Sequence, residues 1–323
     1  MIGCKLLIYM CNKFYYQATL TFLISILLLI PTMTYSDDSK DPAKNELEAC
    51  PLPEATPNHP TGYVTGAGAH FSWIIFDSLK RDLERLSGRK ILLYGKDSML
   101  GQGCNAGIKN ASLNGPNKET FGFVCCPLSK KEVTDKKLKV YPLALEPILI
   151  LVNQNNPVNN LTSQQVRDIF AGKISNWKEV GGNDQPIAVV TRLHCKQRPG
   201  HWKTILPDAK AFRKVRLNVS SADEMVKRVS DFDSAIGHTG STWLFETGNK
   251  VKHITVDGRS PTTANLKNKR YPFYRPLSAV TDLNPSKAVL KIIKEVQTGT
   301  AFFGVAKRFN LLPLNKQASQ VSQ

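Results

Sequence analysis

The sequence lacks the cysteine and histidine spacings that are typical of metal sites and of thiol oxidoreductases. Its seven cysteines include no Cys-x-x-Cys pair, and its six histidines include no pair four residues apart. Without these spacings the chain gives little support to a zinc site or to thioredoxin-like redox chemistry. We therefore expect no bound metal and no cofactor.

A nucleic-acid-binding stretch is also missing. The formal net charge is +17, but the basic residues are scattered, and no arginine-rich run with interleaved aromatic residues occurs. The charge favours an acidic ligand or surface, and the scatter argues against a nucleic acid as the partner. A hydrophobic content of 41% and a charged content of 21% are those of an ordinary globular protein, so the chain as a whole is not disordered.

Residues 1–36 contain two lysines and no acidic residue, which is typical of an export signal. An apolar run from Thr19 to Ile30 is short for a membrane-spanning helix, and Thr34-Tyr35-Ser36 offers small residues where a signal peptidase cleaves. We expect cleavage before Asp37 and a periplasmic or extracellular location. An uncleaved anchor is the alternative. Because no cysteine stands at the expected cleavage point, lipid attachment is not favoured.

Beyond residue 60, strand-like apolar runs alternate with helical patterns. The predicted strands are Tyr63–Thr65, Lys90–Tyr94, Phe121–Val124, Glu146–Val152, a run from Ile187, Ser234–His238 and Tyr271–Val280. One helix is predicted over Phe71–Leu86, and another begins at about Ile108. Two more begin at the capping boxes Thr162/Gln165 and Ser221/Glu224. The final predicted helix lies between Asn284-Pro285 and Gly299. This βαβ pattern predicts a largely parallel sheet whose binding edge lies at the carboxyl ends of the strands.

A basic loop follows the strand that begins at Ile187. It holds Arg192, Lys196 and Arg198 within seven residues. A guanidinium and the N–H groups of a helix start both present donors without acceptors, so they suit a desolvated anion. We interpret this loop as one half of an anion site and the glycine turns at 66–70 and 101–107 as the other half. A solvated surface loop is the alternative.

From about Tyr63 to Leu314 the chain resembles the periplasmic phosphate-binding proteins of ABC transporters, within the type II superfamily of two-lobed periplasmic binding proteins. The most specific marks are Gly66-Ala67-Gly68-Ala69-His70-Phe71, Leu161–Phe170 with Gly172–Trp177, and Ala235-Ile236-Gly237. The resemblance implies an α/β fold of two lobes, each a mostly parallel sheet flanked by helices, with a hinge of crossing strands. It also implies an oxyanion dehydrated between the lobes.

We expect the following division of the chain. Residues 1–36 are a signal peptide, 37–60 a flexible leader, 61–147 with 275–316 lobe 1, 148–274 lobe 2, and 317–323 a frayed tail.

The resemblance also implies a set of ligand residues, and this chain departs from the family pattern at several of them. His70 stands where the family has a hydroxyl residue, and Cys104 and Asn105 stand where its glycine loop has hydroxyl residues. Thr120 occupies the position of an aspartate that accepts the proton of hydrogen phosphate. After the arginine, the family has Ser-Gly-Thr and this chain has Lys196-Gln197-Arg198. Ala69, Phe71 and Arg192 match. Losing an acid and gaining cations favours a larger or more charged anion, so sulfate, molybdate, an organic phosphate or a carboxylate metabolite stay open beside phosphate. A slip of the alignment, with another acid in that role, is also open.

Cysteines and histidines gather at the predicted strand ends. They are His70, Cys104, Cys125, Cys126, His194, Cys195, His201 and His238. If these loops converge, thiolates and imidazoles could hold copper or zinc, and the second hypothesis is a metal- or thiol-handling binding protein on the same fold. Disulfides and packed thiols are the simpler explanation. A thiol-redox enzyme is a third.

The pairing of the cysteines stays open. Five cysteines lie beyond the signal, so at least one thiol is free or pairs with another molecule. A bridge between the neighbours Cys125 and Cys126 would be strained, so one of them is expected to pair with Cys104 inside lobe 1. A bridge from Cys104 to Cys195 would instead tie the two lobes together.

The sequence therefore predicts a non-enzymatic, monomeric solute-binding protein without a nucleic-acid partner. It would capture an oxyanion, phosphate first, between two lobes that close on it, and deliver it to an ABC-type membrane permease or another partner. A structural or signalling role without a ligand is the remaining alternative.

Overall fold

The computed structural model describes residues 58–94, 103–193, 202–243 and 250–314, apart from the side chains of His70, Ser72 and Trp73. The expected signal peptide, nearly all of the leader, the loop residues Lys196, Gln197 and Arg198, and the tail lie outside the described residues. Among the helices that are described, none has the length and apolar character needed to cross a bilayer.

The main sheet is mixed, and its strand order is β2-β1-β3-β11-β4-β8-β6-β7. These strands are β1 (Tyr63–Gly68), β2 (Lys90–Leu93), β3 (Glu119–Val124), β4 (Lys139–Asn153), β6 (Ala188–Thr191), β7 (Leu217–Asn218), β8 (Ala235–Gly240) and β11 (Tyr274–Thr281). Pairing is parallel within β2-β1-β3 and within β8-β6-β7, and antiparallel wherever β4 or β11 takes part. The predicted two-lobed α/β fold is confirmed.

Shorter strands complete the sheets. β9 (Val251–His253) and β12 (Leu312–Pro313) pair with β4, and β5 (Asn160–Leu161) pairs with β10 (Thr255–Val256) in a separate small sheet.

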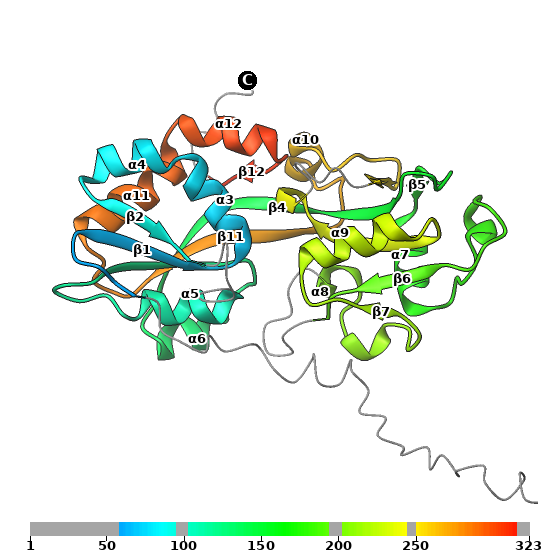
Figure 1. Cartoon of the computed structure of the whole chain (residues 1–323), viewed down its shortest axis with the longest axis horizontal. Coiled ribbons are helices and arrows are strands. Elements are labelled where there is room, and N and C mark those ends of the chain that lie inside the picture. Colours follow the sequence, from blue (N-terminus) through cyan, green and yellow to red (C-terminus); the bar gives the residue numbers. More distant parts are fainter. Residues whose placement is uncertain (1–57, 95–102, 194–201, 244–249, 315–323) are drawn as a thin grey trace, which may run out of the picture. The chain divides into compact units, whose positions relative to one another are not determined.

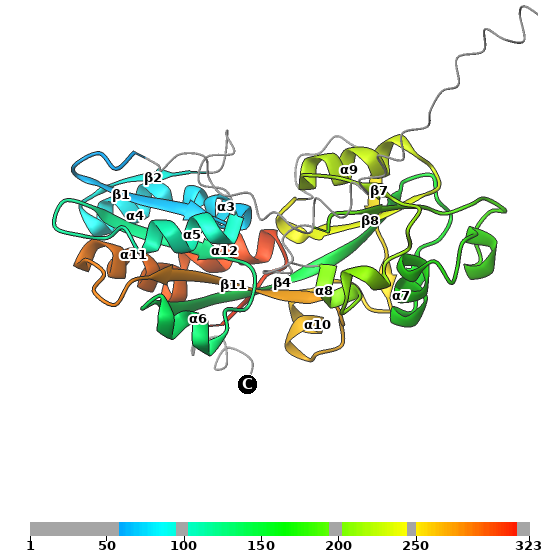
Figure 2. The same cartoon turned by 90° about the horizontal axis from the view of Figure 1, so that it is seen from below.

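Strands β4 and β11 are the long crossing strands, and they run from the β1–β3 group into the β6–β8 group (Figure 1, and from below in Figure 2). In β4 the side chains of Ile148, Ile150 and Val152 join one core cluster, whereas Leu149 and Leu151 join another. This strict alternation arises because successive residues of a strand point to opposite faces. Both faces of the sheet are therefore buried here, which explains why residues 147–152 are all apolar.

Helices cover both faces of each strand group (Figure 1). Around β1–β3, one face carries α3 (His70–Ser78), α4 (Lys80–Ser87), α11 (Lys287–Thr298) and α12 (Ala301–Arg308), and the other carries α5 (Gly103–Ala111) and α6 (Lys130–Asp135). Around β6–β8, one face carries α7 (Ser163–Ala171), α8 (Trp202–Ile205) and α10 (Thr263–Lys267), and the other carries α9 (Ala222–Asp231). The 3-10 turns are η1 (Trp177–Val180), η2 (Ala209–Ala211) and η3 (Ser241–Trp243).

The cores follow these groups. One large cluster joins buried side chains of residues 64–144 with those of 277–311, and another lies within residues 148–273. The lobe boundaries given above stay a prediction.

The capping signals read from the sequence have different outcomes. Thr162 and Gln165 form the complete predicted box at the start of α7, and Gly172 ends that helix with φ +82°, a conformation that favours glycine. Ser221 accepts a hydrogen bond from the N–H of Glu224, but the Glu224 carboxylate binds Ser220 instead. The second box is thus incomplete.

Two predicted helices differ in extent from the observed ones, and one observed helix was not predicted. The single helix predicted over residues 71–86 is broken at Leu79 into α3 and α4, α5 begins at Gly103 rather than near Ile108, and α12 follows the helix expected to be the last. Leu79 and Leu83 are both buried, so the apolar spacing continues across the break. Periodicity records which side of a helix is buried, and it does not record a change in the direction of the axis.

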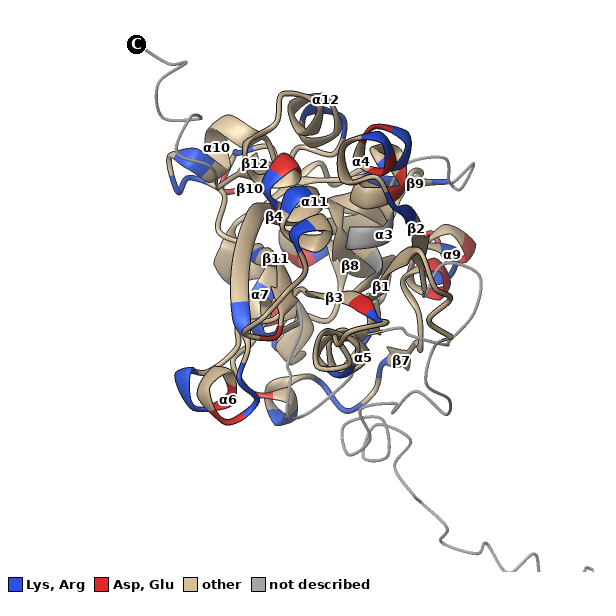
Figure 3. Ribbon diagram, turned by 90° about the vertical axis from the view of Figure 1, so that its left-hand side faces the viewer, with Lys and Arg blue, Asp and Glu red and all other residues tan. Residues whose placement is uncertain are grey.

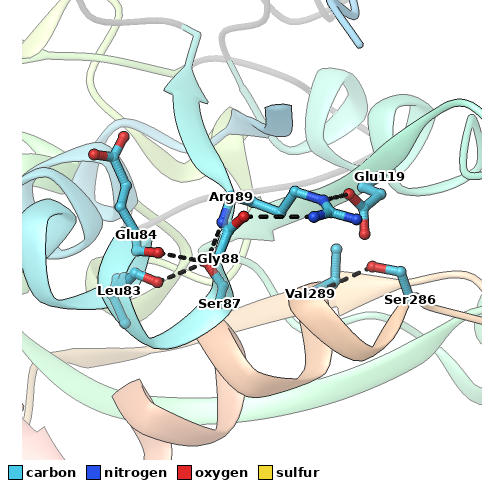
Figure 4. Close-up of polar contacts among 8 residues, drawn as sticks. All are labelled: Leu83, Glu84, Ser87, Gly88, Arg89, Glu119, Ser286 and Val289. Atoms are coloured by element: carbon cyan, nitrogen blue, oxygen red, sulfur yellow. Dashed lines mark hydrogen bonds and ion pairs between the residues drawn. The ribbon is translucent and has the colours of Figure 1, made fainter. Parts of the chain in front are cut away.

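Polar contacts set the turn from α4 into β2 (Figure 4). The Ser87 hydroxyl donates to the carbonyl oxygen of Leu83, and Arg89 reaches across to Glu119 on β3 with Nε 2.5 Å from Oε2. On the neighbouring helix α11, Ser286 caps the N–H of Val289. The two serine contacts are local to their helices, whereas the Arg89–Glu119 pair links the start of the edge strand β2 to β3.

Candidate functional site

Helix α5 lies directly against the backbones of β1 and β3, with glycine at each point of contact. A Cβ on Gly122 would overlap the carbonyl of Gly107, and a Cβ on Gly107 or Gly68 would lie 2.8 Å from the amide nitrogen of Phe123. Asn110, at the carboxyl-terminal end of α5, donates to the carbonyls of Thr65 and Phe121 over 3.0 and 2.8 Å. The amino terminus of α5 is therefore held at the carboxyl ends of β1 and β3.

These contacts correct the predicted role of the glycine turns. Gly68 and Gly107 were expected to let an anion approach an open turn, but they allow close packing between helix and strand, and Gly107 lies within α5. Cys104 and Asn105 likewise lie in the first turn of α5 and not in a loop before it. In the first turn of a helix the backbone N–H groups have no carbonyl acceptor within the same helix.

Helix α3 begins at the same edge of the sheet. The N–H of Ala69 donates to the carbonyl of Phe123 over 3.1 Å, so this group, which was predicted to bind the ligand, is already used by the fold. No described side chain caps α3, which leaves the N–H groups of its first turn, from His70 and Phe71 onward, to meet an anion. The Phe71 side chain is buried in the core and can contribute only its backbone.

Three thiols gather where α5 begins and β3 ends. The Sγ atoms of Cys104 and Cys125 lie 3.7 Å apart, and the N–H of Cys125 donates to Cys104 Sγ over 3.3 Å. Cys104 is partly exposed, and Cys125 and Cys126 are buried. Within the part of the chain that the structure describes, no group of three cysteine, histidine or acidic side chains is arranged to hold a metal ion. Three of the predicted metal ligands, His194, Cys195 and His201, lie outside the described residues.

Cys104 and Cys125 are protonated at neutral pH. Hydrogen bonding with Cys125 lowers the pKa of Cys104, but hydrogen bonding with Cys126 and burial raise it by more, to about 12. Hydrogen bonding with Cys104 and burial raise the pKa of Cys125 well above its ordinary value. These cysteines are thus neutral neighbours of any ligand bound at this edge.

Thr120 lies apart from this cluster. It is the second residue of β3, opposite Thr65, and three residues before Phe123, which is about 10 Å along a strand. Its hydroxyl is fully buried and has no hydrogen-bond partner among the described residues. Cys125, not Thr120, stands at the carboxyl end of β3. The signal in the sequence was that Cys125 directly follows the strand.

Arg192 belongs to the second strand group, directly after β6. Its Nε donates to the carbonyl of Ser220 over 2.9 Å, which fixes the orientation of the guanidinium. On the neighbouring strand β8, His238 is buried against the ring of Phe170. Burial, then the charges of Arg192 and Arg275, lower the pKa of His238 to about 3, so the imidazole is neutral at pH 7.

A buried ion pair joins the two crossing strands. Arg275 Nε on β11 lies 2.6 Å from Glu146 Oε2 on β4, and the N–H and hydroxyl of Thr242 donate to Glu146 Oε1 over 3.0 and 2.6 Å. Burial lowers the pKa of Arg275, but the Glu146 carboxylate raises it by more, so the net shift is upward. A side chain on Gly240 would overlap the Glu146 carboxylate, so glycine is needed there. Sequence reasoning missed this pair.

Arg275 connects the two halves of the predicted site electrostatically. Its charge lowers the pKa of His238, beside Arg192, and also favours the thiolate of Cys125, beside Cys104. Those predicted ligand residues that the structure describes therefore fall into three sets. Ala69, His70, Phe71, Cys104 and Asn105 lie at the edge formed by α3 and α5; Arg192 lies on the second strand group; and Thr120 lies apart from both.

The net positive charge does not by itself locate the site. Lysines and arginines are spread over many elements, among them α4, α6 and α11, with acidic residues between them (Figure 3). The helix starts and Arg192 locate the site better because they combine donors with a fixed geometry.

Comparison with known protein families gives a match over most of the chain. A family model described as the PBP superfamily domain matches residues 55–302. Among curated proteins, the phosphate-binding protein PstS of Bacillus subtilis is 30% identical over 146 residues, which are 45% of this chain and 47% of the relative. PstS of Borreliella burgdorferi is 24% identical over 163 residues, 48% of this chain and 58% of the relative. The chain thus spans about half the length of the curated relatives it matches.

Solved structures match over a longer range. A putative phosphate ABC transporter substrate-binding protein with bound phosphate from Clostridium perfringens has a TM-score of 0.65 and 27% identity, and the match covers 78% of this chain and 100% of that one. An ABC-type phosphate transport receptor from Vibrio cholerae has a TM-score of 0.58 and 23% identity, with 78% and 99% covered, and shows the fold alone. The resemblance stated from the sequence is confirmed.

Proposed function

Because this chain belongs to the PBP superfamily, we propose that it is an exported solute-binding protein, not an enzyme, that captures phosphate and delivers it to an ABC-type permease. The observation that carries this proposal is the meeting of two helix starts at one sheet edge. Ala69, before α3, bonds to the carbonyl of Phe123, and α5 packs on the same residue through Gly107.

Two helix starts favour an anion for two reasons. Each presents N–H groups that no carbonyl of its own helix accepts, and each carries the positive end of a helix dipole. A tetrahedral oxyanion has enough acceptor oxygens to bind both sets of donors and a guanidinium as well. Arg192 supplies that guanidinium from the second strand group, so binding would draw on both groups.

Phosphate is favoured over other anions because the relatives that match this chain include phosphate-binding proteins and a structure with bound phosphate. The cluster offers Cys104 and Cys125 as neutral thiols and no described carboxylate other than the paired Glu146. A site without a free acid does not reject a fully deprotonated oxyanion by repulsion. Sulfate and molybdate therefore belong in the same assay.

The test is calorimetric titration of the exported chain with phosphate, sulfate and molybdate. Charge-assisted hydrogen bonds contribute about 1.5–3 kcal/mol each, so Arg192→Ala should weaken phosphate binding by roughly 10- to 100-fold. Arg85→Ala is the matched control because the Arg85 side chain is 82% exposed and pairs only with the exposed Asp82 in α4. The control should bind like the parent chain.

Two results would refute the proposal. One is the absence of binding heat with every oxyanion at millimolar concentration, and the other is equal binding by the Arg192→Ala and Arg85→Ala variants. Amino-terminal sequencing of the exported protein separately tests cleavage before Asp37. Sedimentation in the presence of phosphate tests the expected monomer.

A further inference from the structure

The thiols at the start of α5 are not needed for anion capture, yet two of them are placed to react with each other. Cys104 Sγ and Cys125 Sγ are 3.7 Å apart, and a disulfide needs about 2.05 Å. Closing the gap requires a movement of less than about 2 Å, which rotation about the side-chain bonds and a small shift of one helical turn can supply.

The surrounding backbone holds the pair in place. α5 packs on β3 through Gly107 and Gly122 without intervening side chains, and Asn110 binds the carbonyl of Phe121. The two cysteines therefore sit on elements whose separation is fixed by backbone contact. The N–H of Cys125 also donates to Cys104 Sγ, which aligns the Cys104 sulfur with the residue that would be its partner.

Cys125 is a better partner for Cys104 than Cys126 is. Only Cys125 combines the 3.7 Å sulfur contact with the backbone N–H bond to Cys104. A bridge between Cys125 and Cys126 is disfavoured because neighbouring residues can form a disulfide only with strain. Cys104 is partly exposed, so an oxidant can reach one member of the pair while the other stays buried.

We propose that Cys104 and Cys125 form a disulfide in the exported protein, joining the first turn of α5 to the end of β3. The oxidant is a disulfide of low molecular weight or of a thiol oxidase. The Cys104 thiol loses its proton as its sulfur attacks one sulfur of that disulfide, and the thiolate that leaves takes up a proton, so a mixed disulfide forms. The Cys125 thiol then loses its proton, attacks Cys104 Sγ and releases the second thiolate, which is protonated in turn. The pair loses two protons and two electrons, and the oxidant becomes two thiols.

The bond has a consequence for the anion site, and this part rests on the proposed function. The N–H groups of Cys104 and Asn105 are donors in the first turn of α5. A disulfide fixes that turn against β3 before the ligand arrives, so the turn loses less conformational entropy when the ligand binds. The oxidised form should bind phosphate at least threefold more tightly than the reduced form.

The first measurement is peptide mapping of the full exported chain after alkylation under denaturing conditions. Expected is a cross-linked pair of tryptic peptides, one with Cys104 and one with Cys125 and Cys126, that separates on reduction and is accompanied by the loss of two hydrogen atoms in the intact mass. Cys126→Ser should keep the cross-link, and Cys125→Ser should abolish it. If the serine variants do not fold, fragmentation of the cross-linked peptides from the parent chain decides, because it shows whether the alkyl group is on Cys126 or on Cys125.

Alkylation of both Cys104 and Cys125 after incubation with glutathione disulfide would overturn the proposal, and so would a cross-link of Cys104 to Cys50, Cys126 or Cys195. The second measurement is phosphate titration of the oxidised and reduced forms. Equal affinities would overturn the effect on binding. Failure of both forms to bind any oxyanion would refute the proposed function while the peptide map still stands.

Discussion

Removing the charge of Glu146 should destabilise the protein more than any change at a surface ion pair. Glu146 is fully buried, its carboxylate lies 2.6 Å from Arg275 Nε, and the Arg275 side chain is only 8% exposed. In Glu146→Gln the amide can still accept the two hydrogen bonds from Thr242, but the buried charge of Arg275 loses the carboxylate it pairs with. Breaking a buried pair in this way costs about 3–5 kcal/mol in the free energy of unfolding.

The assay is urea unfolding followed by circular dichroism, with Asp82→Asn as the control. Asp82 and Arg85 form an ion pair within α4 whose side chains are 61% and 82% exposed. Such pairs contribute about 0–1 kcal/mol, so the control should unfold at nearly the parent urea concentration. The difference between the two variants isolates the effect of burial.

A double variant sharpens the comparison. Glu146→Gln with Arg275→Met removes both charges, and it should recover most of the stability lost in the single variant because no buried charge is left uncompensated. If Glu146→Gln costs no more than Asp82→Asn, or if the double variant is less stable than the single one, the buried pair does not act as described.

Two further predictions concern His238 and Gly122. The pKa of His238 is about 3 in the folded protein and 6.5 in the unfolded chain, so between these pH values the unfolded chain binds more protons. The free energy of unfolding should therefore fall by about 1.4 kcal/mol per pH unit as the pH drops from 6 to 4. His238→Phe should flatten this slope in urea titrations, and an unchanged slope would contradict the assignment. Gly122→Ala should lower the free energy of unfolding by at least about 3 kcal/mol because the added Cβ would overlap the Gly107 carbonyl. Gly115→Ala is the control: there is open space around Gly115, so thermal unfolding of both variants should show a loss of less than about 0.5 kcal/mol for this one.

The sequence by itself determined the elements whose cause is local. The Thr162/Gln165 box lies within four residues, so the start of α7 could be predicted from residue types alone. The apolar run Glu146–Val152 predicted a strand, and β4 includes it. Together with the motifs shared with phosphate-binding proteins, these features were enough to predict the two-lobed α/β fold.

Only the tertiary structure decided how the candidate site is assembled. The Ala69 N–H donates to the carbonyl of Phe123, which is more than fifty residues away in the sequence. Gly107, which was predicted to lie in a ligand-binding loop, instead packs against the sheet at the same residue. Glu146 and Arg275 pair across 129 positions of the chain, and Cys104 meets Cys125 across 21. Residue spacing encodes hydrogen bonds and periodicity over a few positions, but which distant groups come within bonding distance depends on how whole helices and strands pack. For this reason the sequence identified Arg192 and Cys104 as candidates and left open which of Cys125 and Cys126 pairs with Cys104. The structure places Cys125 Sγ beside Cys104 Sγ and shows the buried ion pair.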